Sequence, residues 1–173
     1  MSEDLTQETN ALVMSRFVAV FRRDDCLLFS YERSRIDHLG LRLREKEVRL
    51  MIKSKLKRLG PVLMGTDPRS LAMTPLEGSE DGIKDVLSKI DQNLEAMANR
   101  PLTHRLVEQV LDITEHERRR WTKDGRLPQS GYATFRKGRE IFIALYSVKK
   151  ISQLLATPEV IAAWREADSK KGF

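Results

Sequence analysis

The stretch ITEHERRRWTKDGRLPQ, residues 113–129, restricts the local fold more than any other part of the chain. Thr114 followed three residues later by Glu117 is the pattern of a capping box, in which each side chain bonds the other residue's backbone at a helix start. Gly125 suits the left-handed conformation that commonly ends a helix. The sequence therefore predicts a short helix over 115–124.

A second helix is predicted directly before it, over HRLVEQVLD, with Thr103 at its start and an apolar stripe along one side. Only Asp112 to Thr114 separates the two helices, and so short a connection is typical of a helix-turn-helix unit. Trp121 is the one large apolar residue of the later helix. We expect it to anchor that helix on its neighbours, with Leu127 beside it.

The residues that follow predict a hairpin. Strand-forming residues at 132–135 and 140–145 flank the turn-like RKG, so we predict a β-hairpin wing over 132–145. Ser147 can begin the next helix, and Pro158 suits the first position of a last one. The order helix, turn, helix, hairpin, helix is that of a winged helix-turn-helix.

Basic residues gather on the predicted helix and wing, and the net charge of +6 favours acidic partners. The planar fork of arginine fits both phosphate groups and guanine edges. We therefore expect the chain to bind double-stranded DNA, with the helix over 115–124 in the major groove and the wing on the backbone or in the minor groove. The predicted DNA-binding residues are His116, Arg118, Arg119, Arg120, Lys123, Arg126, Arg136, Lys137 and Arg139.

The same region, in ITEHERRRWTKDGRLP and the later LYSVKKISQLL, resembles the MerR-type and excisionase-type DNA-binding domains. In that family an aromatic residue ends the recognition helix, and Gly-x-Leu-Pro, a hairpin wing and another helix follow. Trp121 matches the aromatic position, and Gly125 and Leu127 match the turn. Tyr146 lies at the start of the following helix, so these four residues are the expected structural anchors.

The resemblance covers about residues 100–155 and implies a winged helix-turn-helix that binds DNA. Arg118 stands where the family usually has an apolar core residue, and the wing of this chain is longer. We assign the domain to 100–173.

The N-terminal residues carry weaker signals. LVMSRFVAVF (12–21) and CLLFSY (26–31) fit either a helix or a hairpin of two strands, and we favour the helix. A basic helix is predicted over 36–59, so 1–60 becomes a mostly helical region of unknown role. The prolines and glycines after it predict a linker over 61–82.

The segment IKDVLSKIDQNLEAM, residues 83–97, predicts an amphipathic helix that extends over 83–99. Ile83, Ile90 and Met97 recur every seven residues, which is the spacing of a coiled-coil seam. Such a seam packs either inside the chain's own fold or against a second chain. A homodimer through 83–97 is therefore one of two alternatives.

Several classes of protein are disfavoured. Cys26 is the single cysteine and the three histidines are far apart in sequence, so we expect no disulfide framework, metal site or cofactor. The acidic start MSEDLTQETN differs from a signal peptide, and no apolar run reaches the roughly 18 residues of a membrane span. We therefore expect a cytoplasmic protein. His116 and the flanking glutamates point to different sides of a helix, so we expect no catalytic residues and no enzyme.

Together these patterns predict a mainly α chain. A helical N-terminal region, a linker and an amphipathic helix would precede a C-terminal winged helix-turn-helix domain with a small β-hairpin wing. The predicted function is sequence-specific DNA binding, as a transcriptional regulator or a recombination accessory factor. The alternative is a non-catalytic adaptor that uses the winged fold to bind protein.

Overall fold

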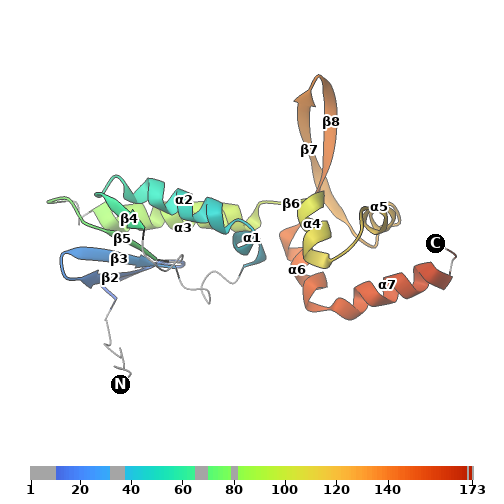
Figure 1. Cartoon of the computed structure of the whole chain (residues 1–173), viewed down its shortest axis with the longest axis horizontal. Helices are drawn as coiled ribbons and strands as arrows, with labels where there is room; N and C mark the ends of the chain where they lie inside the picture. The colour runs from blue at the N-terminus through green and yellow to red at the C-terminus, as the bar shows by residue number, and fades with distance from the viewer. Residues whose placement is uncertain (1–10, 32–37, 65–69, 79–81, 171, 173) are drawn as a thin grey trace. The chain divides into compact units, whose positions relative to one another are not determined.

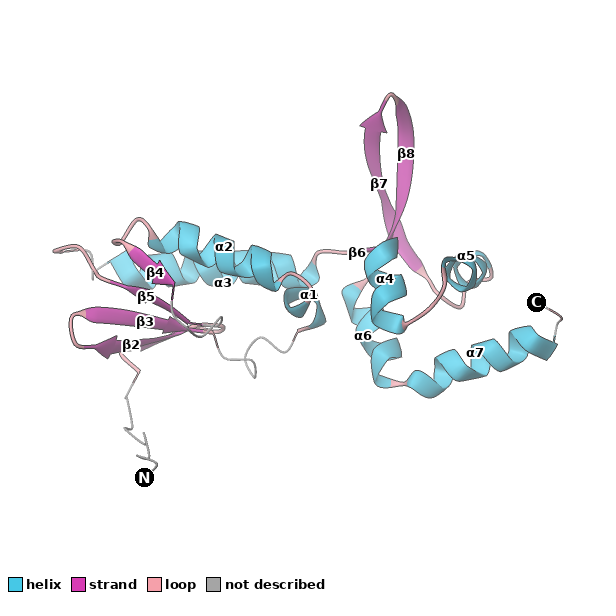
Figure 2. Cartoon of the chain, viewed as in Figure 1, coloured by secondary structure: helices cyan, strands magenta, loops and turns pink. Residues whose placement is uncertain are grey.

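The computed structural model of the chain describes residues 11–31, 38–64, 70–78, 82–170 and 172. The chain forms two compact units, Met1–Met97 and Ala98–Phe173. Each unit contains a β-sheet and several helices, which Figure 1 labels and Figure 2 distinguishes by colour.

The first unit is built on a five-stranded antiparallel sheet with the order β1-β2-β3-β5-β4. Its strands are β1 (Val13–Met14), β2 (Ala19–Arg23), β3 (Cys26–Ser30), β4 (Val62–Met64) and β5 (Ser70–Met73). The acidic turn between β2 and β3 places Asp24 in the left-handed region, with φ of 52°. Alternation is clear on β3, where Leu27 and Phe29 are buried, whereas Cys26, Leu28 and Ser30 are only partly buried.

Two expectations for this half of the chain are wrong. The described residues 13–30 form strands rather than a helix. Alternate side chains of these strands are buried in the core, and the backbone of β3 pairs with β5, far along the chain. The segment predicted as a linker over 61–82 contains the strands β4 and β5. These two strands pair with each other, and β5 also pairs with β3.

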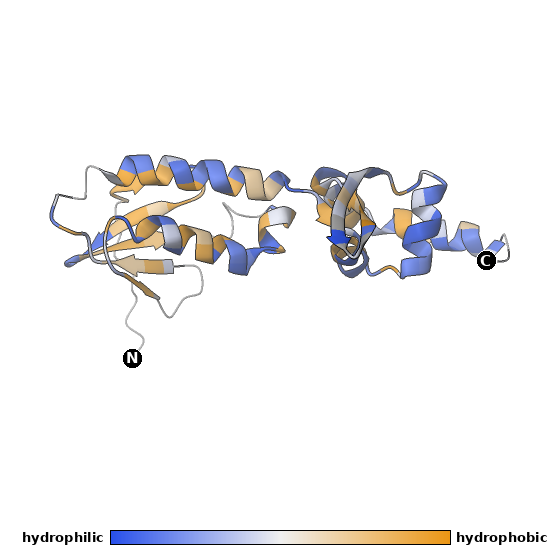
Figure 3. Ribbon diagram, turned by 90° about the horizontal axis from the view of Figure 1, so that it is seen from above, coloured by the Kyte–Doolittle hydropathy of each residue, from blue (hydrophilic) through white to orange (hydrophobic). Residues whose placement is uncertain are grey.

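Helices α1 (Leu39–Arg42), α2 (Glu45–Leu56) and α3 (Ile83–Asn99) complete this unit. Figure 1 shows α2 and α3 together on one side of the sheet. Coloured by hydropathy, both helices carry apolar residues along one side and hydrophilic residues along the other (Figure 3). The helix predicted over 83–99 is therefore confirmed as α3.

The seven-residue seam of α3 is used inside the chain. Ile83, Leu87, Ile90 and Leu94 are all at most 3% exposed. Because these side chains are already buried, they offer no apolar seam to a second copy. The structure thus gives no support to a homodimer through 83–97.

The second unit places a three-stranded sheet, with the order β6-β8-β7, among four helices. Its elements in chain order are β6 (Leu102–Thr103), α4 (His104–Leu111), α5 (Glu115–Lys123), β7 (Gln129–Lys137), β8 (Arg139–Tyr146), α6 (Val148–Ala156) and α7 (Pro158–Lys170). The hairpin of β7 and β8 is longer than the predicted 132–145, because it begins at Gln129 and ends at Tyr146. Its base is tied to the helices because β8 also pairs with β6.

The chain as a whole is not mainly α, and that prediction is wrong. Eight strands in two antiparallel sheets stand beside seven helices in the described residues. The five-stranded sheet of the first unit is the part that the prediction lacked. Its strands are short, and their apolar residues fit the period of a helix as well as the period of a strand. Spacing alone therefore did not exclude a helix.

Candidate nucleic-acid interface

Helices α4 and α5 are joined by a turn that the sequence sets up locally. Asp112 adopts a left-handed conformation with φ of 50°, and the Ile113 N–H bonds back to the Glu108 carbonyl at 3.0 Å. The capping box is present, since the Glu117 N–H donates to Thr114 Oγ1 at 3.2 Å and the Thr114 N–H donates to the Glu117 carboxylate at 2.7 Å. These bonds define the start of α5 as the sequence predicts.

The end of α5 is equally well defined. Gly125 has φ of 83°, a conformation that costs glycine little. The Leu127 N–H donates to the Trp121 carbonyl at 2.8 Å, which turns the chain back under the helix. Leu127 is fully buried there, so the turn both ends α5 and fastens it to the unit.

Trp121 is fully buried, with an exposed fraction of 0%. Its indole N–H donates to Asp168 of α7 at 2.8 Å, and its ring meets the edge of Trp164 with centroids 5.0 Å apart. A buried indole N–H needs such an acceptor, because an unpaired buried donor is costly. Trp121 therefore joins α5 to α7 by one polar and one aromatic contact.

Arg118 was expected to contact DNA, but the structure buries it. Its Nε donates to Glu108 at 2.6 Å and its Nη1 donates to the Tyr146 hydroxyl at 3.2 Å. The same hydroxyl lies 2.9 Å from Thr122 Oγ1. Burial alone would lower the pKa of Arg118, but these bonds raise it, so the guanidinium stays charged inside the unit. Arg118 is a structural residue in a core position.

Arg120 and Arg126 are also committed to structural contacts. Both donate to the Asp168 carboxylate, at 2.9 Å and 2.7 Å. Arg126 additionally bonds Asp124 and lies over the rings of Trp121 and Trp164. Although burial would raise it, the pKa of Asp168 is lowered, because the Trp121 indole and the Arg126 guanidinium donate to this carboxylate.

The exposed side of α5 carries the remaining predicted DNA-binding residues of this helix. His116, Arg119 and Lys123 are exposed and follow the spacing i, i+3, i+7, which places them on one face. Arg118 and Trp121 lie on the opposite face. Arg119 pairs with Glu115 at 2.6 Å, but its side chain is 69% exposed, and an exposed pair of this kind contributes at most about 1 kcal/mol. Arg119 can therefore exchange this partner for another anion.

The wing carries further basic residues. Gly138, with φ of 76°, forms its tip between the paired residues Lys137 and Arg139. Arg136 is exposed, whereas the side chains of Lys137 and Arg139 lie outside the described part of the structure. Sequence reasoning did not single out the apolar residues of the wing.

Tyr132 and Phe142 are 60% and 62% exposed and meet edge to face at 6.4 Å. Cross-strand aromatic contacts of this kind help to stabilise a hairpin that has little sheet around it. An exposed aromatic pair is also suited to contact with a partner. The available signal was an aromatic residue in each predicted strand of the hairpin, Tyr132 in YATF and Phe142 in EIFIAL.

The residues of α7 were also missed. Trp164, Arg165 and Asp168 each contact the turn or helix that begins at Thr114, and Arg165 donates to Glu117 at 2.7 Å. That contact, reinforced by the Thr114 N–H, lowers the pKa of Glu117 against the opposing effect of burial. The spacing of Trp164 and Asp168, four residues apart on a helix, was the available signal.

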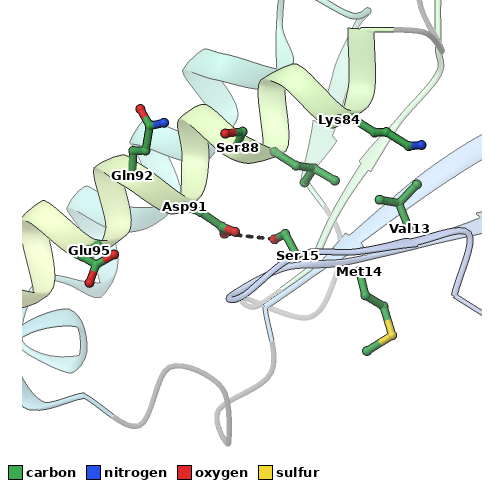
Figure 4. A pocket seen from close by; sticks show the side chains of 9 residues that line it. Val13, Met14, Ser15, Lys84, Ser88, Asp91, Gln92 and Glu95 are labelled. Atoms are coloured by element: carbon green, nitrogen blue, oxygen red, sulfur yellow. Dashed lines mark hydrogen bonds between the residues drawn. The ribbon is translucent and has the colours of Figure 1, made fainter.

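Other sites offer less chemistry. A groove of about 430 Å³ lies between β1 and α3 in the first unit (Figure 4). Lys84 and Glu95 line it but stand about 16 Å apart along α3, so they do not converge on one ligand. Asp91 points toward Ser15 and accepts its hydroxyl at 2.9 Å, which ties the helix to the sheet.

The described residues contain no group of three or more His, Cys, Asp or Glu that could hold a metal ion. In that same part of the chain, no helix combines the length and the apolar character needed to cross a membrane.

Comparisons with known proteins return no relative. No protein-family model, curated protein or solved structure matches this chain. The function therefore has to be inferred from the geometry and charge of the described residues.

Proposed function

We propose that this chain binds specific sequences in double-stranded DNA, as a transcriptional regulator or a recombination accessory factor. The observation that carries the proposal is the exposed stripe of His116, Arg119 and Lys123 on α5. The opposite side of the same helix is locked to the unit through Arg118 and Trp121. A helix held in this way presents its cations on a rigid support.

The major groove of DNA, about 12 Å wide, admits one α-helix. Arg119 can bond a guanine edge with two donors, and Lys123 can bond a phosphate or a guanine. Glu115, which pairs with Arg119 in the free chain, would be displaced or would turn to a cytosine amino group. Base contacts from this face would give the selectivity.

The wing would supply contacts of another kind. Arg136 and the tip residues Lys137 and Arg139 stand on a hairpin, which can follow the phosphate backbone or the minor groove. Such contacts add affinity without strong dependence on sequence. The resemblance to MerR-type and excisionase-type domains supports this division of roles between helix and wing.

The second candidate function is a non-catalytic adaptor that binds protein. The exposed pair Tyr132 and Phe142 favours it, because aromatic residues are enriched at protein interfaces. In that case the cations of α5 would serve only to keep the helix solvated.

A salt series separates the two candidates. Binding to a site selected from random DNA is measured between about 50 and 200 mM salt, since only phosphate contacts give a steep dependence. Arg119→Ala should cost about 1–3 kcal/mol and relax the preference at one base pair, whereas Arg136→Ala should lower the salt slope by about one. Lys46→Ala is the control, because Lys46 is an exposed base on α2 of the first unit.

Unchanged binding in both Arg119→Ala and Arg136→Ala would contradict the proposal. So would the absence of any selected site, and the adaptor would then be the better account. A change of preferred sequence in Arg136→Ala, with a uniform loss in Arg119→Ala, would reverse the roles assigned to helix and wing.

A further inference from the structure

The face of the five-stranded sheet that lies opposite α2 and α3 carries an unusual row of residues. The strand register aligns Phe21, Leu28, Ala72 and Leu63 side by side across β2, β3, β5 and β4. Because side chains alternate along a strand, this row points away from the buried residues Leu27 and Phe29 and their neighbours. Four adjacent strands thus present apolar side chains on the outer face.

Solvent reaches this row. Leu63 is 60% exposed, and Phe21, Leu28 and Ala72 are each partly exposed. Within the described residues, the two long helices of the unit lie on the other side of the sheet (Figure 1). An antiparallel sheet with one solvated face normally carries polar residues there. A contiguous apolar row in that position is typical of an interaction surface.

We propose that this row is the interface of a homodimer and that a second copy of the same sheet covers it. A two-fold axis parallel to the strands, midway between the two stacked sheets and level with the gap between Leu28 and Ala72, reverses the order of the row. Phe21 then faces Leu63 of the second copy, and Leu28 faces Ala72. The long side chain of Leu28 meets the short one of Ala72, which is how facing layers interdigitate. The row is therefore complementary to itself, as a two-fold interface requires.

The charge of the row also favours self-pairing. None of its four residues is ionisable, so two identical rows meet without repulsion. An acidic or basic partner would find no complementary charge in it. With strands about 4.8 Å apart, the row is about 14 Å long, and two such sheets can stack about 10 Å apart. The α3 seam, which is buried inside the unit, takes no part in this interface.

The test compares two leucines of nearly equal exposure. Leu63 is 60% exposed on the row, and Leu50 is 57% exposed on α2. Sedimentation equilibrium of the full chain at tens of micromolar, without DNA, should show a dimer for the wild type and for Leu50→Lys. Leu63→Lys places two charges in the interface and should weaken association by about a hundredfold or more. Circular dichroism checks that both variants keep their fold, and Leu63→Gln replaces Leu63→Lys if that variant loses it.

A second variant tests the two-fold geometry. Phe21 and Leu63 are separated by two intervening strands in one chain, but they face each other across the proposed axis. Phe21→Glu combined with Leu63→Lys should therefore restore part of the association that Leu63→Lys alone removes. A monomeric wild type overturns the proposal, as does a dimer that survives Leu63→Lys or that Leu50→Lys disrupts equally. Because no DNA is present, these outcomes do not depend on the proposed DNA-binding function.

Discussion

Replacing Trp121 by alanine should remove the main anchor of α5. The side chain is 0% exposed, and a buried tryptophan removes about 150–250 Å² from water. At about 25 cal/mol per Å² this corresponds to about 4–6 kcal/mol. Measured truncations of buried aromatic residues cost about 3–5 kcal/mol. We expect the substitution to lower the free energy of unfolding of the second unit by about 3–5 kcal/mol. The free energy of unfolding of a typical domain is about 5–15 kcal/mol, so this is a large part of it.

The assay is denaturant unfolding followed by tryptophan fluorescence. The chain has two tryptophans, Trp121 and Trp164, and both belong to the second unit, so the signal reports that unit alone. Trp164→Ala is the matched control, because Trp164 is only partly buried and should cost less. Trp121→Phe keeps an aromatic ring but removes the donor to Asp168, and should fall between the two. An unchanged midpoint in Trp121→Ala, with DNA binding alone lost, would refute the anchoring role.

Three further outcomes can be measured. Gly60→Ala should destabilise the first unit, because the added Cβ would collide with the backbone carbonyl oxygen of Thr74, and an unchanged thermal midpoint would contradict this. Asp91→Ala should lower the free energy of unfolding of the same unit by about 1–3 kcal/mol, since the carboxylate accepts three bonds from residues 15–17. Glu117 has a lowered pKa because Arg165 donates to it, so its contribution to stability is present above the ordinary carboxyl pKa and is lost as pH falls through the lowered value. Glu117→Gln should therefore reduce the acid sensitivity of the second unit in pH-dependent thermal melts, and an unaltered pH profile would count against this linkage.

Local sequence signals predicted much of the second unit. The pair Thr114 and Glu117, together with Gly125, defined both ends of α5 because capping depends on residues within one turn of the helix end. Pro158 marked the start of α7 for the same reason. Strand-forming residues on either side of a glycine turn were sufficient for the hairpin, whose two strands are neighbours in sequence.

The sheet of the first unit could not be predicted in this way. Its strands are two to five residues long, too short for their apolar spacing to separate a strand from a helical turn. The decisive pairing of β3 with β5 joins segments about forty residues apart. The glycines and prolines of 61–82 predicted a linker, but they flank the strands β4 and β5. Hydrogen bonds to distant residues compensate for the weak local preference of this segment for strand structure.

The sequence by itself determined where α5 begins and ends, that arginines crowd it, and that Trp121 is its one large apolar residue. Only the tertiary structure decided which arginines face inward. Arg118 turns toward Glu108, and Arg120 and Arg126 turn toward Asp168 on a helix more than forty residues further along. A guanidinium that is partly or fully removed from water requires a carboxylate partner in reach, and here that partner comes from another helix of the packed unit rather than from the local spacing of charges along α5.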